Sequence, residues 1–219
     1  MINLYNEDCL QAMRRMETDQ YDLAIVDPPY GIGFDKDIFN EMHKKPCKTW
    51  KNRTPKNYKK KEWDKERPSK EYFIELLRIS KKQIIWGGNY FTDLLPVSAG
   101  RIIWNKGVSE NFTRSMGELA WVSFTNNLKI KKYLWDGYKK CEQVDRIHPT
   151  QKPVALYTWI LNNYAKEGDK ILDTHLGSGS IAVACHDMGY SLDGYELDTE
   201  YYEAACKRLK EHQRQLKLF

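Results

Sequence analysis

Residues 170–196 read KILDTHLGSGSIAVACHDMGYSLDGYE, and this stretch decides the fold. Its apolar runs have the length of strands, and its glycines stand where a turn is needed and where a helix should stop. The predicted elements are a strand at Lys170–Asp173, a turn at Leu176–Gly179, a helix at Ser180–Met188 that ends at Gly189, and a strand at Ser191–Glu196. The stretch therefore predicts a β-α-β unit.

Similar alternation of strands and helices extends outward through the rest of the chain. Further strands are expected at Ile2–Tyr5, Tyr21–Val26, Gln83–Trp86, Arg101–Trp104 and Glu118–Phe124. Helices are expected from Cys9 to about Glu17, after the capping residue Ser69, and from Pro153 through Ala165, and residues 129–140 form a Lys-rich connection. This order predicts an α/β fold, a doubly wound and mostly parallel sheet with helices on both faces.

Length and charge suit one folded domain spanning residues 1–219. The chain has 219 residues, 41% of them hydrophobic, a mean hydropathy of −0.71 and a net charge of +5. Residues 36–70 hold 13 Lys and Arg against 5 Asp and Glu, so they carry +8 and the remainder −3. The segment at about 36–67 shows no sustained periodicity, and we interpret it as a basic inserted arm.

Cysteine and histidine usage places the protein in a reducing compartment without a metal site. The five cysteines form no C-x-x-C pair, and the five histidines lack the spacing of zinc ligands. The first residues are acidic where a secretory signal needs basic and apolar ones, and no run of 18 apolar residues occurs. We expect a cytoplasmic protein that has no contact with a membrane.

The glycine turn and the acid that ends the following strand predict a nucleoside pocket. Gly177 and Gly179 allow backbone to approach a ligand, and the helix that begins at Ser180 points amides at an anionic group. Glu196 lies 23 residues beyond Asp173, where a carboxylate can accept hydrogen bonds from both ribose hydroxyls. Alone, the pattern is also compatible with a simple strand-terminating turn, and it does not separate dinucleotides from other nucleosides.

A second motif, Asp27-Pro28-Pro29-Tyr30, follows an apolar strand where open α/β sheets bind ligands. The prolines leave a backbone carbonyl unpaired, and this oxygen and the Asp27 carboxylate can accept the two protons of an exocyclic amine. The Tyr30 ring can stack on a base. The alternative is a capped turn beside a core tyrosine.

This tetrapeptide resembles the catalytic motif of amino-group DNA methyltransferases, and other segments resemble that family's motifs in order. The glycine loop is similar to its cofactor motif, Glu196 to its ribose acceptor, His148-Pro-Thr-Gln-Lys152-Pro153 to the segment beside the methionine end of the cofactor, and Asn6-Glu7-Asp8 to the adenine contact. The tetrapeptide precedes the glycine loop, as in the circularly permuted beta group. The resemblance implies the Rossmann-like methyltransferase fold and covers the chain except residues 36–67 and the middle.

The resemblance implies transfer of a methyl group from S-adenosylmethionine to the N6 amine of adenine in double-stranded DNA. Adenine is favoured over cytosine because the motif begins with Asp rather than Ser. The implied catalytic residues are Asp27, Pro28, Pro29 and Tyr30. The implied cofactor-binding residues are Asp8, Cys9, Asp27, His148, Thr150, Gln151, Lys152, Asp173, Thr174, Gly177, Ser178, Gly179, Ser180, Glu196 and Leu197. The family also forms homodimers and pairs with cognate restriction nucleases, and both remain open here.

The chain departs from the family pattern at two places. Asp173-Thr174-His175 stands where members commonly have Asp-Pro-Phe, and His175 is either a hydrogen-bonding substitute for the aromatic wall or a solvent-facing loop residue. The target-recognition region, at about 105–147, is also short.

DNA contact is expected from the basic arm, whose lysines are interleaved with Trp50, Tyr58 and Trp63. The residues expected to bind phosphates are Lys44, Lys45, Lys48, Lys51, Arg53, Lys59, Lys60 and Lys61. A solvated loop is the alternative for this segment. For the whole protein, methylation of cytosine N4 or of RNA and a non-catalytic nucleic-acid-binding module remain alternative functions.

Overall fold

The computed structural model describes residues 1–33, 61, 63–108, 115–135 and 147–214, and its core is an eight-stranded sheet. The strands are β1 (Ile2–Tyr5), β2 (Leu23–Val26), β3 (Gln83–Trp86), β4 (Arg101–Asn105), β5 (Gly117–Val122), β6 (Leu128–Lys132), β7 (Lys170–Asp173) and β8 (Ser191–Tyr195). Their order across the sheet is β1-β8-β7-β2-β3-β5-β4-β6. The first five strands in this order are parallel, and β5 is antiparallel to both β3 and β4. The expected α/β class with a mostly parallel sheet is confirmed.

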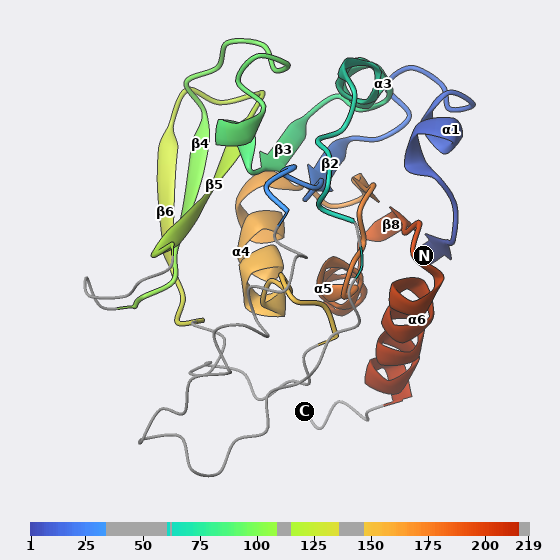
Figure 1. The fold of residues 1–219 in the computed structure, drawn as a ribbon. Helices are drawn as coiled ribbons and strands as arrows, with labels where there is room; N and C mark the ends of the chain where they lie inside the picture. Colours follow the sequence, from blue (N-terminus) through green and yellow to red (C-terminus); the bar gives the residue numbers. More distant parts are fainter. Residues whose placement is uncertain (34–60, 62, 109–114, 136–146, 215–219) are drawn as a thin grey trace. The chain divides into compact units, whose positions relative to one another are not determined.

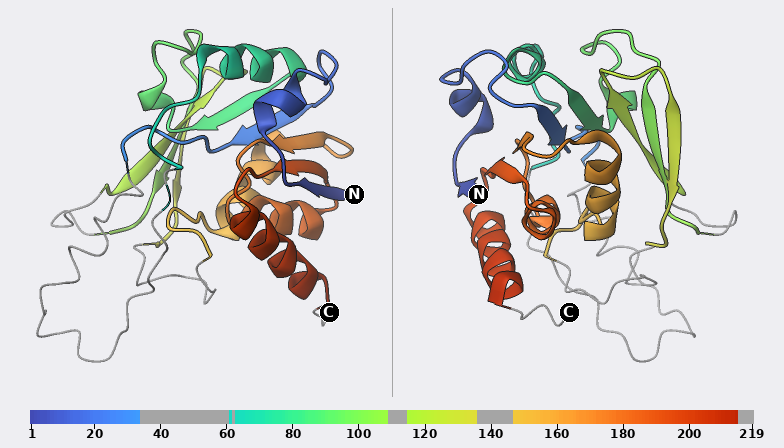
Figure 2. Two further views of the ribbon diagram at one scale, coloured as in Figure 1. Left: turned by 45° about the vertical axis from the view of Figure 1, so that its right-hand side comes forward. Right: turned by 180° about the vertical axis from the view of Figure 1, so that it is seen from behind.

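Helices cover both faces of this sheet (Figure 1). They are α1 (Cys9–Met13), α3 (Lys70–Ile79), α4 (Val154–Tyr164), α5 (Ser180–Met188) and α6 (Thr199–Arg214), with a 3-10 turn η1 (Gly88–Tyr90) after β3. Figure 2 shows α1 and α3 on one side of the sheet and α4, α5 and α6 on the other. This two-sided cover explains why β2 and β3 are buried along their whole length.

Local signals begin and end several helices as expected. The Asp8 carboxylate accepts the amide of Gln11 at 2.9 Å, and the Ser69 hydroxyl accepts the amide of Tyr72 at 3.3 Å, so each caps its helix. Gly189 ends α5 with a φ of +75°, a left-handed conformation that favours glycine.

Three elements differ from the sequence-based expectation. Helix α1 ends at Met13 rather than near Glu17, and the Lys-rich connection contains the edge strand β6. Exposed and half-buried residues alternate along β6, and its lysines are typical of a sheet edge that is protected from pairing with another strand. Helix α6 was not predicted, because its polar face outweighs the buried stripe of Tyr201, Ala205 and Leu209.

The contacts within the chain separate two compact units, residues 1–28 with 69–219, and residues 29–68. The first contains the sheet and the helices. The second corresponds closely to the segment interpreted as the basic arm. Within it, the buried Asp64 carboxylate accepts the backbone amides of Tyr30 at 2.8 Å and Gly31 at 2.9 Å, and the Asp64 carbonyl accepts that of Gly33.

Among the described residues, no helix is long and apolar enough to cross a membrane, and no group of His, Cys, Asp or Glu side chains is arranged to hold a metal ion. The described cysteines Cys9, Cys185 and Cys206 are free thiols.

Candidate functional site

Three carboxylates lie at the carboxyl ends of neighbouring parallel strands. Asp27 follows β2, Asp173 ends β7 and Glu196 follows β8, and these strands are adjacent in the order β8-β7-β2. Parallel strands lie about 4.8 Å apart, so the two strands that carry the outer members of this row are roughly 10 Å apart. The row therefore has the dimensions of a nucleoside site along one edge of the sheet.

Asp27 is part of a network of alternating charges that is partly buried and has the buried Lys152 at its centre. Its Oδ2 atom forms an ion pair with the ammonium of Lys152, which also lies 3.0 Å from Glu118 Oε2. Glu118 in turn pairs with Lys106 at 2.8 Å, and the Lys152 ammonium lies 5.1 Å above the ring of Trp86. The side chain of Lys152 is only 2% exposed. The structure therefore directs this ammonium toward the Asp27 carboxylate.

The opposite charges in this network stabilise the ionised forms of Lys152 and Glu118. Burial alone would lower the pKa of Lys152, but Asp27 and Glu118 more than offset it and raise that pKa above its ordinary value. Burial alone would raise the pKa of Glu118, but the positive charges of Lys152 and Lys106 lower it to about 2. Both groups are therefore charged across the physiological pH range.

Glycines shape the turn between β7 and α5. Gly177 and Gly179 have φ values of +52° and +69°, and a Cβ atom at Gly179 would lie 3.0 Å from the Cβ of Ala205. A larger side chain at Gly179 would thus meet both backbone strain and the close approach of α6. Because these glycines have no side chains, a ligand can approach the backbone of the turn closely.

Ser180, the first residue of α5, ties this turn to the segment before α4. Its hydroxyl donates to the carbonyl of Lys152 at 2.7 Å and accepts from the Arg208 guanidinium at 2.9 Å. Arg208 also donates to the Ser178 carbonyl. The glycine turn and Lys152 are therefore held in one fixed arrangement.

Glu196 is preorganised by backbone amides. One carboxylate oxygen accepts the Gly177 amide at 2.8 Å, and the other accepts the Asp198 amide at 2.9 Å. The side-chain amide of Asn6 donates to the carbonyls of Glu196 and Leu197, which joins the end of β1 to this loop. Leu197 itself is 69% exposed beside the carboxylate.

Asp173 is buried among charges of its own sign. Burial, together with the carboxylates of Asp27 and Glu196, raises the pKa of Asp173 to about 8, although its Oδ1 atom accepts the His175 amide and Lys152 acts the other way. Within the described part of the chain, Lys152 only partly offsets the effect of burial and of the two neighbouring carboxylates on Asp173. A cationic ligand would relieve the repulsion.

His175 is hydrogen-bonded and partly buried. Its Nδ1 atom lies 3.0 Å from the Thr174 hydroxyl, which contacts the Tyr72 hydroxyl at 2.6 Å, and its ring packs edge-on against that of Tyr72. Burial lowers the pKa of His175 to about 4, so the ring is neutral at physiological pH. Of the two interpretations left open by the sequence, this geometry favours the hydrogen-bonding substitute for an aromatic side chain.

The segment before α4 folds on itself. The His148 Nδ1 atom lies 2.9 Å from the Thr150 hydroxyl, and its ring packs against Tyr201 of α6. The side chain of Gln151 accepts the Ile147 amide. At the amino-terminal side, Asp8 caps α1, and burial with the nearby Asp8 charge raises the pKa of Cys9 to about 12.

Asp27, Pro28 and the predicted cofactor residues all lie in the first unit. Direct contacts join Lys152 to Asp27 and to Ser180, and Gly177 to Glu196. Pro29 and Tyr30 belong to the second unit. Of the residues expected to bind DNA, Lys61 is described and half-buried, whereas Lys44, Lys45, Lys48, Lys51, Arg53, Lys59 and Lys60 lie outside the described residues.

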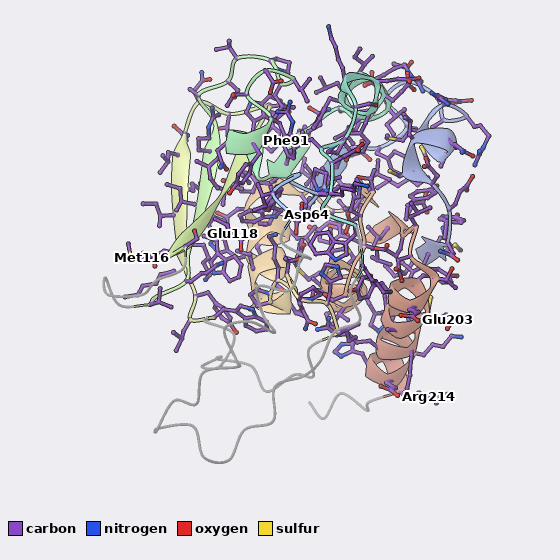
Figure 3. All side chains as sticks on the ribbon, viewed as in Figure 1. Asp64, Phe91, Met116, Glu118, Glu203 and Arg214 are labelled. Atoms are coloured by element: carbon purple, nitrogen blue, oxygen red, sulfur yellow. The ribbon has the colours of Figure 1, made fainter. Side chains whose placement is uncertain are left out.

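Sequence reasoning missed Glu118, Lys106 and Asp64. Glu118 lies on β5, where Figure 3 labels it. No local pattern pairs it with Lys152, 34 positions away in the sequence. Asp64 sits in a charge-rich stretch that reads as solvated, yet its side chain is buried.

Comparison with known proteins agrees with this arrangement. Residues 103–207 match the family model described as DNA methylase of the N6/N4 group. The type II methyltransferase M2.DpnII of Streptococcus pneumoniae is 40% identical over 87 residues, which is 39% of this chain and 32% of that protein. The match thus spans about a third of this curated relative.

Solved structures share the fold over nearly the whole chain. The crystal structure of the M1.HpyAVI-SAM complex has a TM-score of 0.58 and 20% identity, covering 95% of this chain and 99% of that one. The cytosine-N4-specific PvuII DNA methyltransferase has a TM-score of 0.59 and 12% identity, covering 100% of this chain and 88% of that one. These matches make residues 103–207 similar to the N6/N4 DNA methylases, and the solved structures show that the chain shares the fold of these methyltransferases.

Proposed function

We propose that this protein transfers a methyl group from S-adenosylmethionine to the N6 amine of adenine in DNA. The observation that carries the proposal is the row of Asp27, Asp173 and Glu196 on three adjacent strands, with Asp27 at the start of the Asp-Pro-Pro-Tyr motif. At one end of the row, Glu196 can bind a ribose, and at the other end Asp27 can hold an amine for reaction.

The residues of the row fit the cofactor chemically. Both oxygens of Glu196 are oriented by backbone amides, so the carboxylate is set to accept ribose hydroxyls. S-adenosylmethionine carries a positively charged sulfonium and an ammonium group, which match the excess of negative charge around Asp173. When bound, the cofactor supplies an electrophilic methyl group.

Surrounding segments would complete the cofactor site. We assign the adenine end to the region of Asp8, Cys9 and the exposed Leu197, and the methionine end to the glycine turn and the segment that begins at His148. The complete proposed set is Asp8, Cys9, Asp27, His148, Thr150, Gln151, Lys152, Asp173, Thr174, Gly177, Ser178, Gly179, Ser180, Glu196 and Leu197.

Asp27 and Pro28 would activate the target amine by orienting it. The N6 amine of adenine is a poor nucleophile, because its lone pair is delocalised into the ring. Acceptance of its two protons by the Asp27 carboxylate and the Pro28 carbonyl favours a pyramidal nitrogen whose lone pair faces the methyl donor. As the bond from nitrogen to the methyl group forms, the bond from that methyl group to the sulfonium sulfur would break and leave a neutral thioether. The nitrogen would then be cationic, and its proton can pass to Asp27 or to water.

The DNA contacts of this proposal come from the sequence. A base must leave the duplex before its amine can reach such a pocket, and the Tyr30 ring supplies a stacking face for it. The basic arm supplies phosphate contacts on double-stranded DNA. The first residue of the motif, Asp rather than Ser, supports adenine as the target.

Methylation of cytosine N4 is the second candidate. The cytosine amine offers the same two protons to the same pair of acceptors, and the cytosine-N4-specific PvuII enzyme shares the fold. The chemistry of Asp27 is identical in the two cases, so the product must be identified directly.

Transfer of a labelled methyl group to DNA tests the role of Asp27. We expect Asp27→Ala to lower the transfer rate about a hundredfold, by analogy with the deletion of a hydrogen-bond donor from an oxyanion hole. Asp22→Asn is the matched control, because Asp22 precedes the same strand but pairs with the exposed Lys81. Near-normal turnover by Asp27→Ala would refute the assignment.

A further inference from the structure

The start of β5 lies at the same sheet edge as the ends of β2 and β3. Strand β5 is antiparallel to β3, with Ala120 opposite Trp86. Glu118 precedes Ala120 by two residues, so it extends past the end of β3 toward the site edge. An acid at the beginning of one strand is thus brought beside residues at the ends of others.

Lys152 connects this acid to Asp27. Its ammonium is almost completely withdrawn from solvent, and it contacts both carboxylates and the face of Trp86. A single carboxylate would leave a buried ammonium poorly compensated. Glu118, whose own second partner is Lys106, supplies the additional negative charge.

The backbone of Lys152 is fixed as firmly as its side chain. Its carbonyl accepts the hydroxyl of Ser180, and Ser180 is also bound by Arg208. The residue therefore touches the glycine turn with its main chain and Asp27 with its ammonium. Any displacement of Lys152 would alter the distance between these two parts of the site.

We propose that Lys152 is a positioning residue that orients the Asp27 carboxylate relative to the glycine turn, and that Glu118 is the counter-ion that keeps Lys152 in place. The inference rests on the proposed methyl transfer and deepens it. It assigns the side chain of Lys152 to the amine-binding group and leaves the proposed cofactor site with the main chain of Lys152, whose carbonyl accepts the Ser180 hydroxyl.

The test compares Lys152→Met, Glu118→Gln and the double variant with the wild-type protein. Two quantities are measured for each, the single-turnover rate of methyl transfer to DNA and the Kd for S-adenosylmethionine by calorimetry. Lys81→Met is the matched control, since Lys81 forms an exposed ion pair with Asp22. Lys152→Arg tests whether a different cation partly restores the rate.

We expect Lys152→Met to lower the rate about a hundredfold, which is typical of a displacement of about 1 Å at a reacting group. The Kd for the cofactor should stay within about threefold, because the main-chain contact with Ser180 remains. Glu118→Gln should lower the rate about tenfold through Lys152, and the double variant should be no slower than Lys152→Met. Lys152→Arg should recover part of the loss, and Lys81→Met should match the wild type.

Two results would overturn the inference while leaving the proposed function intact. The first is an unchanged rate in Lys152→Met, whether or not the Kd for the cofactor weakens, and the second is independent losses that multiply in the double variant. If Lys152→Met does not fold, the rate of Glu118→Gln becomes the deciding measurement. A rate equal to that of the wild type would then overturn the inference. Failure of the wild-type protein to methylate any DNA would instead overturn the proposed function and the inference together.

Discussion

Replacing Asp173 by Asn should stabilise the cofactor-free protein, and increasingly so at higher pH. Asp173 is buried, and its pKa is raised from an ordinary 3.8 to about 8. An acid whose folded-state pKa is raised stabilises the fold while it is protonated. That contribution is lost as the pH rises from about 4 toward about 8.

The size of the effect follows from this shift. Each pH unit between the two pKa values lowers stability by about 1.4 kcal/mol. Between pH 5.5 and pH 8.5 the advantage of Asp173→Asn over the wild type should therefore grow by about 3 kcal/mol. The Asn side chain keeps an oxygen for the His175 amide, so little else changes.

Urea unfolding monitored by tryptophan fluorescence at the two pH values measures this difference. Groups such as His175 titrate in both proteins and cancel. Asp193→Asn is the control, because hydrogen bonds from Asn3, Lys170 and Tyr21 overcome burial and lower the pKa of Asp193. Its loss of stability should be equal at pH 5.5 and pH 8.5. A difference between Asp173→Asn and wild type that does not vary with pH would refute the reasoning.

Three further predictions concern the ligands and the second unit. Cofactor binding should release a fraction of a proton near pH 7, because a cation beside Asp173 favours the ionised form of this acid. Calorimetry in buffers of different ionisation enthalpy measures the number of protons released, and a value of zero would contradict the prediction. Glu196→Gln should raise the Kd for S-adenosylmethionine at least about tenfold, since its amide nitrogen would face the backbone N–H of Gly177 or Asp198, and an unchanged Kd would exclude the ribose role. Neutralising four lysines of the basic arm should reduce the slope of log Kd for DNA against log salt by about 3 to 4, whereas an unchanged slope would make the arm a spacer.

The β7-turn-α5-β8 unit could be predicted from sequence almost to the residue, because short-range signals determine it. An apolar strand, a glycine turn and a terminating Gly189 act over a few positions each. Helix α6 was missed although Tyr201, Ala205 and Leu209 recur at helical spacing, since its remaining surface is strongly polar.

The site was predicted less completely than the fold, for a physical reason. Asp27, Asp173 and Glu196 each stand at the end of an apolar strand, which marks them in the sequence. Glu118 stands at the beginning of a strand and joins the site only because β5 is antiparallel. The partners of Lys152 depend on this long-range arrangement, which no local pattern specifies.

Identification of the methylated nucleoside tests the central claim most directly. Purified protein would be incubated with unmodified plasmid DNA and isotopically labelled S-adenosylmethionine, and the digested DNA analysed by mass spectrometry. The account predicts labelled N6-methyladenine, formed about a hundredfold more slowly by Asp27→Ala. Labelled N4-methylcytosine as the product, or the absence of any labelled base, would contradict it.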